Sequence, residues 1–183
     1  MQRINKVKDL TVSAIFCVFI ITGAFIRFDI GVIPFTMQFF FVNLAMLTLN
    51  RKNAVMSVFM YVILGLIGLP VFAQGGGPGY ILNHNFGFIT GFIFGNFVSA
   101  STLNKIKTPS FINYILVSLL NIIIIYIAGI IYYLLISTVY TGNTVIIKTF
   151  LISFLAICLP GDIISLFLSS LIAGRLKIIV NKY

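Results

Sequence analysis

The sequence predicts an all-α membrane protein with six transmembrane helices. Of its 183 residues, 60% are hydrophobic and 8% are charged, whereas soluble domains have roughly 45–50% and about 25%. The apolar residues gather in long runs, and small groups of Lys and Arg separate alternate runs. A chain with so few charged side chains must face lipid over much of its surface. We therefore expect a single domain, residues 1–183, embedded in a lipid bilayer.

Six apolar runs are bounded by charged residues, proline or glycine. The expected spans are about residues 10–26, 37–49, 54–72, 86–103, 111–139 and 149–173. Because about 20 residues cross a hydrocarbon core, the second run is short and must tilt little or be shielded by its neighbours. The basic N-terminus resembles a signal peptide, but no small-residue cleavage site precedes Arg27 and further spans follow. We interpret this segment as a retained first helix.

The basic residues predict the orientation of the chain. With six spans, ten of the twelve cations fall on one side, and only Arg27 and Lys148 fall on the other. The positive-inside tendency then places both termini in the cytoplasm, which fits the plasma membrane of a bacterial-type cell. The net charge of +9 does not indicate nucleic acid, because the cations form no basic face. The ten same-side cations are Arg3, Lys6, Lys8, Arg51, Lys52, Lys105, Lys107, Arg175, Lys177 and Lys182.

Motifs for catalysis, nucleotide binding or metal binding are absent from the sequence. Cys17 and Cys158 lie in apolar runs without CxxC spacing, which is typical of buried packing residues. The single histidine, His84, is interpreted as a hydrogen-bonding loop residue and not as a metal ligand. Neither a phosphate-binding loop nor HExxH nor a carboxylate pair occurs. We expect no enzyme activity and no cofactor.

The stretch GLPVFAQGGGPGYILNHNFGF, residues 68–88, is the main interruption of the apolar pattern. Consecutive glycines allow backbone conformations that other residues resist and let the backbone approach a ligand closely. Amide side chains and aromatic rings in the same loop suit a small polar heterocycle. The candidate residues are Gln74, Gly75, Gly76, Tyr80, Asn83, Asn85 and Phe86.

Asp162, in the motif CLPGD, is the only acidic residue deep in a predicted span. Ionisable groups there are costly and indicate function. We expect Pro160 and Gly161 to interrupt the sixth helix and to turn the carboxylate toward a cavity. The alternative is a structural role, either in an ion pair with Lys148 or Arg27 or as a helix cap.

Small residues mark two possible helix-packing faces. Gly87, Gly91 and Gly95 recur every four residues in the fourth span, which permits close approach of another helix. We interpret them as an intramolecular packing face, with docking of a partner subunit as the alternative. The first span has a weaker small face at Ser13, Ala14 and Cys17.

Several segments together resemble the BioY family of biotin transporters, which are substrate-capture (S) components of energy-coupling factor (ECF) transporters. These segments are GAFIRFDIGVIPFTMQ, GLIGLPVFAQGGGPGYIL, FGFITGF and LPGD, and the resemblance extends from the first span to Gly174. It implies a six-helix S-component fold that binds biotin at the outer side. It also implies uptake together with a coupling membrane protein and two ATPases, some family members working without them.

The resemblance also implies roles for individual residues. Asp162 and Asn83 would bind the ureido ring of biotin, and the PFTMQ segment adds Phe35 and Gln38. Ser165 stands where the family commonly has a lysine. The carboxylate of biotin therefore needs Lys148, Arg27, or hydroxyl and backbone N–H groups. Two alternatives stay open, a transporter for another vitamin-like ligand without ATPase partners and a membrane scaffold without ligand.

Docking to the coupling protein is expected on the first span. Other S components use small residues at four-residue spacing there, and Ala14 matches the first such position. Val18 stands where a second alanine would be typical, so this surface is altered. The candidate docking residues are Ser13, Ala14, Cys17 and Val18.

Overall fold

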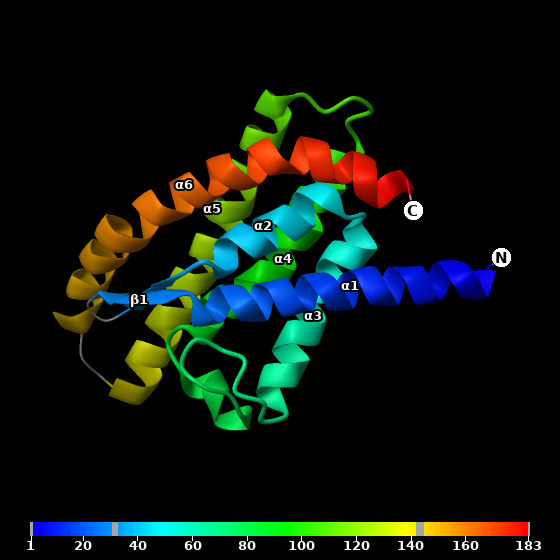
Figure 1. Ribbon diagram of the computed structural model, residues 1–183. Coiled ribbons are helices and arrows are strands. Elements are labelled where there is room, and N and C mark those ends of the chain that lie inside the picture. Colours follow the sequence, from blue (N-terminus) through cyan, green and yellow to red (C-terminus); the bar gives the residue numbers. More distant parts are fainter. Residues whose placement is uncertain (1, 31–32, 142–144, 183) are drawn as a thin grey trace.

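The computed structural model describes residues 2–30, 33–141 and 145–182, and among them the side chains of 6–28, 36–139 and 158–176. These residues form six α-helices and one two-stranded hairpin (Figure 1). The elements are α1 (Gln2–Phe25), β1 (Arg27–Ile30), β2 (Ile33–Thr36), α2 (Gln38–Thr48), α3 (Arg51–Leu66), η1 (a 3-10 helix, Pro78–Leu82), α4 (Phe86–Asn104), α5 (Phe111–Ile136), η2 (a π-helical turn, Ser137–Thr141) and α6 (Val145–Lys182).

The two termini lie at the same end of the bundle, here called the terminal end (Figure 1). The β1–β2 strands, the C-terminal end of α5 and the N-terminal end of α6 lie at the opposite end, here called the hairpin end (Figure 1). Within the bundle, α4 packs along α5, α2 along α6 and α1 along α3. Termini at one end agree with an even number of helices crossing the bundle.

The six helices follow the six predicted runs. Among the described residues, segments of α1, α4, α5 and α6 are long and apolar enough to cross a membrane, whereas α2 is an apolar helix of 11 residues. Helix α3 has 16 residues and ends at Leu66, before the expected span end at residue 72. Gly68, with φ of +109°, and Pro70 follow this end. Both residue types disfavour continued helix, so the last part of the third run forms a loop.

The hairpin was not expected from the sequence, which predicted a purely helical chain. Strands β1 and β2 pair antiparallel, with Arg27 opposite Thr36. The Met37 N–H donates to the Ile26 carbonyl at 3.0 Å and closes the base of the hairpin. The strands thus fix how the chain passes from α1 into α2.

The expected break of the sixth helix at Pro160 and Gly161 is wrong, because α6 continues through both residues. Proline removes one backbone hydrogen bond from a helix, but membrane helices tolerate it when neighbouring groups compensate. Continuity gives α6 one inward face with helical spacing. That face carries Cys158, Asp162, Ser165, Leu166, Ser169 and Ala173, all of them buried.

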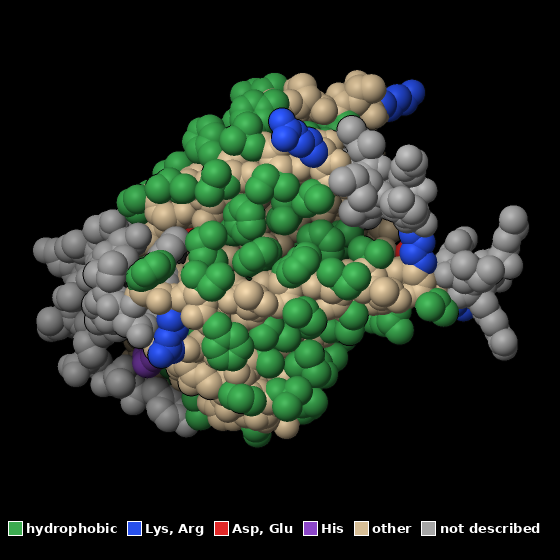
Figure 2. All heavy atoms as spheres, viewed as in Figure 1, with side chains coloured by type: hydrophobic (Ala, Val, Ile, Leu, Met, Phe, Trp, Pro, Cys, Tyr) green, Lys and Arg blue, Asp and Glu red, His purple; other side chains and the backbone are tan. Residues whose placement is uncertain are grey.

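Hydrophobic side chains are spread over the face of the bundle that Figure 2 shows. On α5, the side chains of Ile123, Ile127, Ile131 and Leu135 follow one another every four residues, and each is more than half exposed. Such a stripe suits contact with lipid tails and not with water. The chain is therefore a membrane protein by its surface as well as by its composition.

The glycine face of α4 packs inside the bundle, which confirms the intramolecular interpretation. A Cβ at Gly91 would lie 3.0 Å from the Ile125 carbonyl oxygen and 3.1 Å from the Ile125 Cα. At Gly87 the nearest atoms belong to Tyr132, and at Gly95 to Asn121. All three glycines thus let α4 approach the backbone or side chains of α5 closely.

A cluster of buried amide and hydroxyl groups connects the helices in the middle of the bundle. Asn43 donates to Ser118 Oγ and to Ser169 Oγ, both at 2.8 Å, and accepts from Asn121 Nδ2 at 3.2 Å. Asn96 Nδ2 donates to the Ala54 carbonyl at 3.2 Å. These bonds join α2 to α5 and α6, and α4 to α3. In an apolar environment each bond also fixes the register of its helices.

Asn43→Leu is expected to lower the free energy of unfolding by about 1–2 kcal/mol, because it leaves several buried polar partners without their bonds. Denaturant titration of the detergent-purified protein measures the change. Asn104→Leu, the same exchange at an exposed site at the end of α4, is the control. An Asn43→Leu variant as stable as the control would contradict a stabilising role of the cluster.

Candidate functional site

A pocket lies between the hairpin, the 67–85 loop and helices α2, α4, α5 and α6. Its apolar walls come mainly from Phe39, Phe88, Ile89, Phe92 and Ile125. Its polar groups come from five different segments. They are Thr36, Gln38, Tyr80, Asn85, Tyr126 and Asp162. An apolar pocket with few convergent polar groups is the usual form of a small-molecule site.

Asp162 and Tyr126 form a hydrogen-bonded pair in this pocket. Asp162 is 8% exposed, and its Oδ2 accepts a hydrogen bond of 2.7 Å from the Tyr126 hydroxyl. Tyr126 lies on α5, so the bond also connects α5 with α6. A carboxylate accepts several hydrogen bonds at once, and Asp162 therefore offers further lone pairs to a ligand with N–H groups.

Gln38 is a second buried polar group on the pocket wall, and its side chain is held by two neighbours. Its Nε2 donates to the Tyr61 hydroxyl, and its Oε1 accepts from Thr36 Oγ1 at 3.1 Å. Because both ends of the amide have partners, its orientation is fixed. Gln38 thus shapes the wall between the hairpin and α3.

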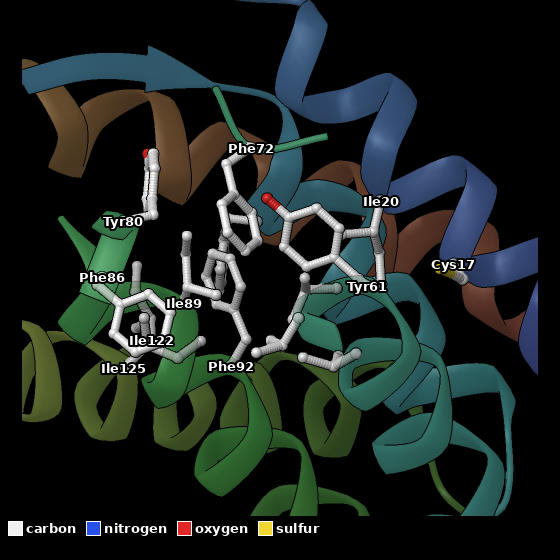
Figure 3. Close-up of a cluster of buried hydrophobic side chains, with 14 of the residues drawn as sticks. Cys17, Ile20, Tyr61, Phe72, Tyr80, Phe86, Ile89, Phe92, Ile122 and Ile125 are labelled. Atoms are coloured by element: carbon white, nitrogen blue, oxygen red, sulfur yellow. The ribbon is translucent and has the colours of Figure 1, made fainter. Parts of the chain in front are cut away.

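The loop of residues 67–85 is anchored in the core by Phe72. This side chain is 1% exposed and lies between the rings of Tyr80 and Tyr61, at centroid distances of 4.5 and 5.2 Å (Figure 3). Gly65 makes room for it, since a Cβ there would overlap the Phe72 ring. The loop is therefore a packed part of the site.

The glycines of the loop serve its own conformation and do not line the pocket. Gly75 and Gly77 have φ of +116° and +109°, a region that side-chain-bearing residues rarely adopt. Gly75 exchanges backbone hydrogen bonds of 2.9 and 3.1 Å with Phe72. Gly76 packs against the Leu69 carbonyl, where a Cβ would not fit. These glycines bring the chain back tightly over the end of α3.

Three amides are bonded to one another in the same loop. Gln74 Oε1 accepts from Asn83 Nδ2 at 3.1 Å and from Asn85 Nδ2 at 3.4 Å, while Asn83 Oδ1 accepts from the Asn85 backbone N–H at 2.9 Å. Of the three, Asn85 lines the pocket. His84 packs on the Tyr133 ring at 4.9 Å between centroids. The amides therefore position Asn85 at the pocket wall.

Tyr80 lies in η1 and faces the pocket. Burial raises the pKa of its phenol above the ordinary value of 10, while a backbone hydrogen bond at Gln74 and the positive charge of Arg27 act in the opposite direction. The net result is a raised pKa, so the phenol is neutral at physiological pH. A neutral phenol can both donate and accept a hydrogen bond.

The structure brings together part of the predicted ligand set. Asp162, Asn85, Tyr80 and Gln38 line the pocket, whereas Asn83, Gln74, Gly75, Gly76 and Ser165 do not. Ser165 is buried in the bundle, and its carbonyl accepts from Ser169 Oγ at 2.7 Å. The side chains of Phe35 and Lys148 lie outside the described residues. The binding roles of all these residues remain predictions.

Sequence reasoning missed Tyr126 and most of the apolar wall. Tyr126 is a single phenol within the apolar run NIIIIYIAG, and that isolation was the available signal. Phe88, Phe92 and Ile125 gave no signal, because nothing in an apolar run shows which side chains face a cavity.

Docking on α1 stays a prediction, and the four predicted docking residues differ in their exposure. Ser13 and Cys17 are buried, and Ser13 Oγ donates to the Asp9 carbonyl at 2.8 Å. Val18, at 57% exposed, lies on the surface and Ala14 is half-buried. The small side chains of Ser13 and Cys17 therefore serve packing inside this chain.

The family model described as the BioY family matches residues 1–182. The chain belongs to the BioY family. A BioY relative from Thermotoga maritima, named biotin transporter BioY, is 35% identical over 171 residues, which cover 93% of this chain and 96% of the relative. A probable biotin transporter BioY from Lysinibacillus sphaericus is 35% identical over 126 residues, 69% of this chain and 64% of the relative.

A solved structure supports the same BioY assignment at the level of the fold. A crystal structure of the S-component for biotin from an ECF-type ABC transporter superposes with a TM-score of 0.81 at 29% identity. The match covers 97% of this chain and 94% of that chain. The chain thus has the fold of an S component, as the sequence resemblance implied.

Proposed function

We propose that the chain captures biotin and serves as the substrate-binding subunit of an ECF-type transporter. The observation that carries the proposal is the pocket containing the Asp162–Tyr126 pair, in a chain whose family relatives are named biotin transporters. The ureido ring of biotin has two N–H donors and one carbonyl acceptor. Asp162 supplies acceptors for the N–H groups, and the Asn85 amide supplies a donor for the carbonyl.

The remaining part of biotin suits the apolar wall. Its sulfur-containing ring and aliphatic chain have few polar atoms, and burial against Phe88 and Phe92 removes them from water. Asn85 takes the amide role that the sequence gave to Asn83, because Asn85 lines the pocket and Asn83 does not. The names of the relatives do not favour another vitamin-like ligand or a scaffold.

The cellular setting belongs to the same proposal. The chain forms one six-span domain in the plasma membrane, with the terminal end in the cytoplasm and the pocket opening outside. A coupling membrane protein and two ATPases provide energy for uptake. Its support is the cation distribution in the sequence together with the ECF-type fold match.

Calorimetric titration of the detergent-purified protein with three ligands tests the function. Biotin and desthiobiotin, which share the ureido ring, are expected to bind, and an analogue without this ring is expected to bind roughly 100-fold more weakly. Equal binding of all three would contradict a ureido site. Uptake measured with and without the coupling protein and ATPases then separates partner-dependent from solitary transport.

A further inference from the structure

Arg27 lies at the border of the pocket on the hairpin. As the first residue of β1 it stands directly opposite Thr36, a pocket-lining residue. Its guanidinium Nη1 donates to the carbonyl of Ala73, a second lining residue. The side chain thus bridges the hairpin and the 67–85 loop at the place where both meet the pocket.

The charge of Arg27 also acts on the pocket itself. Tyr80 is a third lining residue, and its phenol experiences the positive charge of Arg27. Arg27 is exposed to solvent, so its guanidinium stays at the rim without the cost of burying a charge. Arg27 is thus related to three lining residues, by strand pairing to Thr36, by a hydrogen bond to Ala73 and by its charge to Tyr80, and it therefore lies at the rim of the pocket.

The other cations whose side chains the structure describes lie far along the chain from this rim. They occupy the first turns of α1, the start of α3, the segment after α4 and the last turns of α6, toward the terminal end (Figure 1). The described pocket lining contains a carboxylate, Asp162, and no cation. Position 165, where the family resemblance implied a lysine, carries a buried serine outside the lining.

A ligand with a carboxylate must place that group away from Asp162, because two like charges in a pocket of low polarity repel each other strongly. The rim with Arg27 is the available position of opposite charge in the described part of the pocket. A guanidinium has five N–H donors in a planar fork, so Arg27 can bind a ligand carboxylate in addition to the contacts that it makes within the chain.

We propose that Arg27 binds the ligand carboxylate at the rim of the pocket and replaces the missing lysine of α6. The inference rests on the proposed function, since it concerns the acidic end of the same ligand. Asp162 and Arg27 then recognise opposite ends of one molecule.

Titration with biotin and with biotinamide, in which a neutral amide replaces the carboxylate, tests the assignment. The wild-type protein is expected to bind biotin roughly 10- to 100-fold more tightly than biotinamide. Arg27→Gln is expected to abolish this preference by weakening biotin binding while leaving biotinamide binding nearly unchanged. Arg27→Lys, which keeps the charge and loses the fork, is expected to retain part of the preference. The ratio of the two affinities is independent of the folded fraction.

Lys148→Gln is the matched control, because Lys148 is the other cation that the sequence places on the same side as Arg27. The Lys148→Gln variant is expected to prefer biotin over biotinamide as strongly as the wild type does. An Arg27→Gln variant that binds both ligands equally less well has lost only a loop contact, which overturns the proposal. Loss of the preference in Lys148→Gln alone also overturns it. If the wild type binds neither ligand, the proposed function itself fails, whereas tight binding of biotin without preference over biotinamide overturns only the role of Arg27.

Discussion

Asp162→Asn is expected to weaken biotin binding by roughly 100-fold or more while the protein stays folded. Asparagine has nearly the same shape, but it replaces one charged acceptor by an N–H₂ donor. That donor faces the ureido N–H groups, so one hydrogen bond is lost and the other loses its charge assistance. Bulk solvent compensates little for this loss, because Asp162 is 8% exposed and lies in a pocket with mainly apolar walls.

Two variants separate this effect from general disturbance. Asp9→Asn makes the same exchange at the terminal end, where Asp9 bonds to Asn53 at 3.0 Å, and is expected to leave the affinity unchanged. Tyr126→Phe removes the 2.7 Å bond to Asp162 and keeps the ring, and is expected to weaken binding by about tenfold. Titration calorimetry of the three variants gives the comparison. Unchanged biotin affinity in Asp162→Asn would exclude Asp162 from ureido recognition.

The contribution of Asp162 also depends on the ligand. Desthiobiotin keeps the ureido ring, so its affinity is expected to fall in Asp162→Asn by the same factor as that of biotin. An analogue without the ureido ring is expected to bind the variant and the wild type alike. A uniform loss for all three ligands would indicate that the exchange deforms the pocket.

The helices could be predicted from the sequence because each is an apolar run with a polar or glycine-containing boundary. Helix α4 begins at Phe86 and ends at Asn104, within one residue of the expected span. Helix α3 differs, since the run continues to Phe72 while the helix ends at Leu66. A high hydropathy predicts that a residue is buried but does not predict its secondary structure. Phe72 is buried, but it belongs to a loop that folds back into the core. Apolar character alone therefore does not distinguish helix from anchored loop.

Pro160 shows a second reason why the sequence-based prediction was wrong. Tertiary packing can override the tendency of a proline to end a helix. Proline and glycine predict a break, yet α6 continues through Pro160, and this continuity is what places Cys158 and Asp162 one turn apart on the pocket side. The hairpin was hidden for a similar reason. Its four-residue strands are too short to produce a recognisable alternation, and their pairing depends on the base contact between Ile26 and Met37.

The candidate site was predictable where a polar residue stood in an apolar context. Asp162 was found for this reason, and Tyr126 carried the same kind of signal in a weaker form. Asn83 and Asn85 were indistinguishable in the sequence, since both are loop amides two residues apart. In the structure both amides donate to Gln74, and of the two only Asn85 lines the pocket.

Gly91→Leu is expected to cause the largest loss of stability, about 3 kcal/mol or more in the free energy of unfolding. Even a Cβ at Gly91 would lie 3.0 Å from the backbone carbonyl oxygen of Ile125, so a leucine forces α4 away from α5. Among the described residues these two helices pack against each other more extensively than any other pair, and α5 carries Tyr126 while α4 carries Phe88 and Phe92. Separation therefore also widens the pocket.

Val98→Leu, an added methylene on the exposed face of the same helix, is the matched control, and its stability is expected to equal that of the wild type. Thermal unfolding in detergent, followed by circular dichroism, measures the stability of both variants. Tryptophan fluorescence cannot be used, because the chain contains no tryptophan. Added biotin is expected to stabilise the control as it does the wild type, since a ligand that binds only the folded state raises the unfolding temperature. Biotin is expected to raise the unfolding temperature of Gly91→Leu only slightly, because the separation of α4 from α5 widens the pocket and weakens binding. A Gly91→Leu protein with wild-type stability would mean that α4 and α5 do not pack through the glycine face.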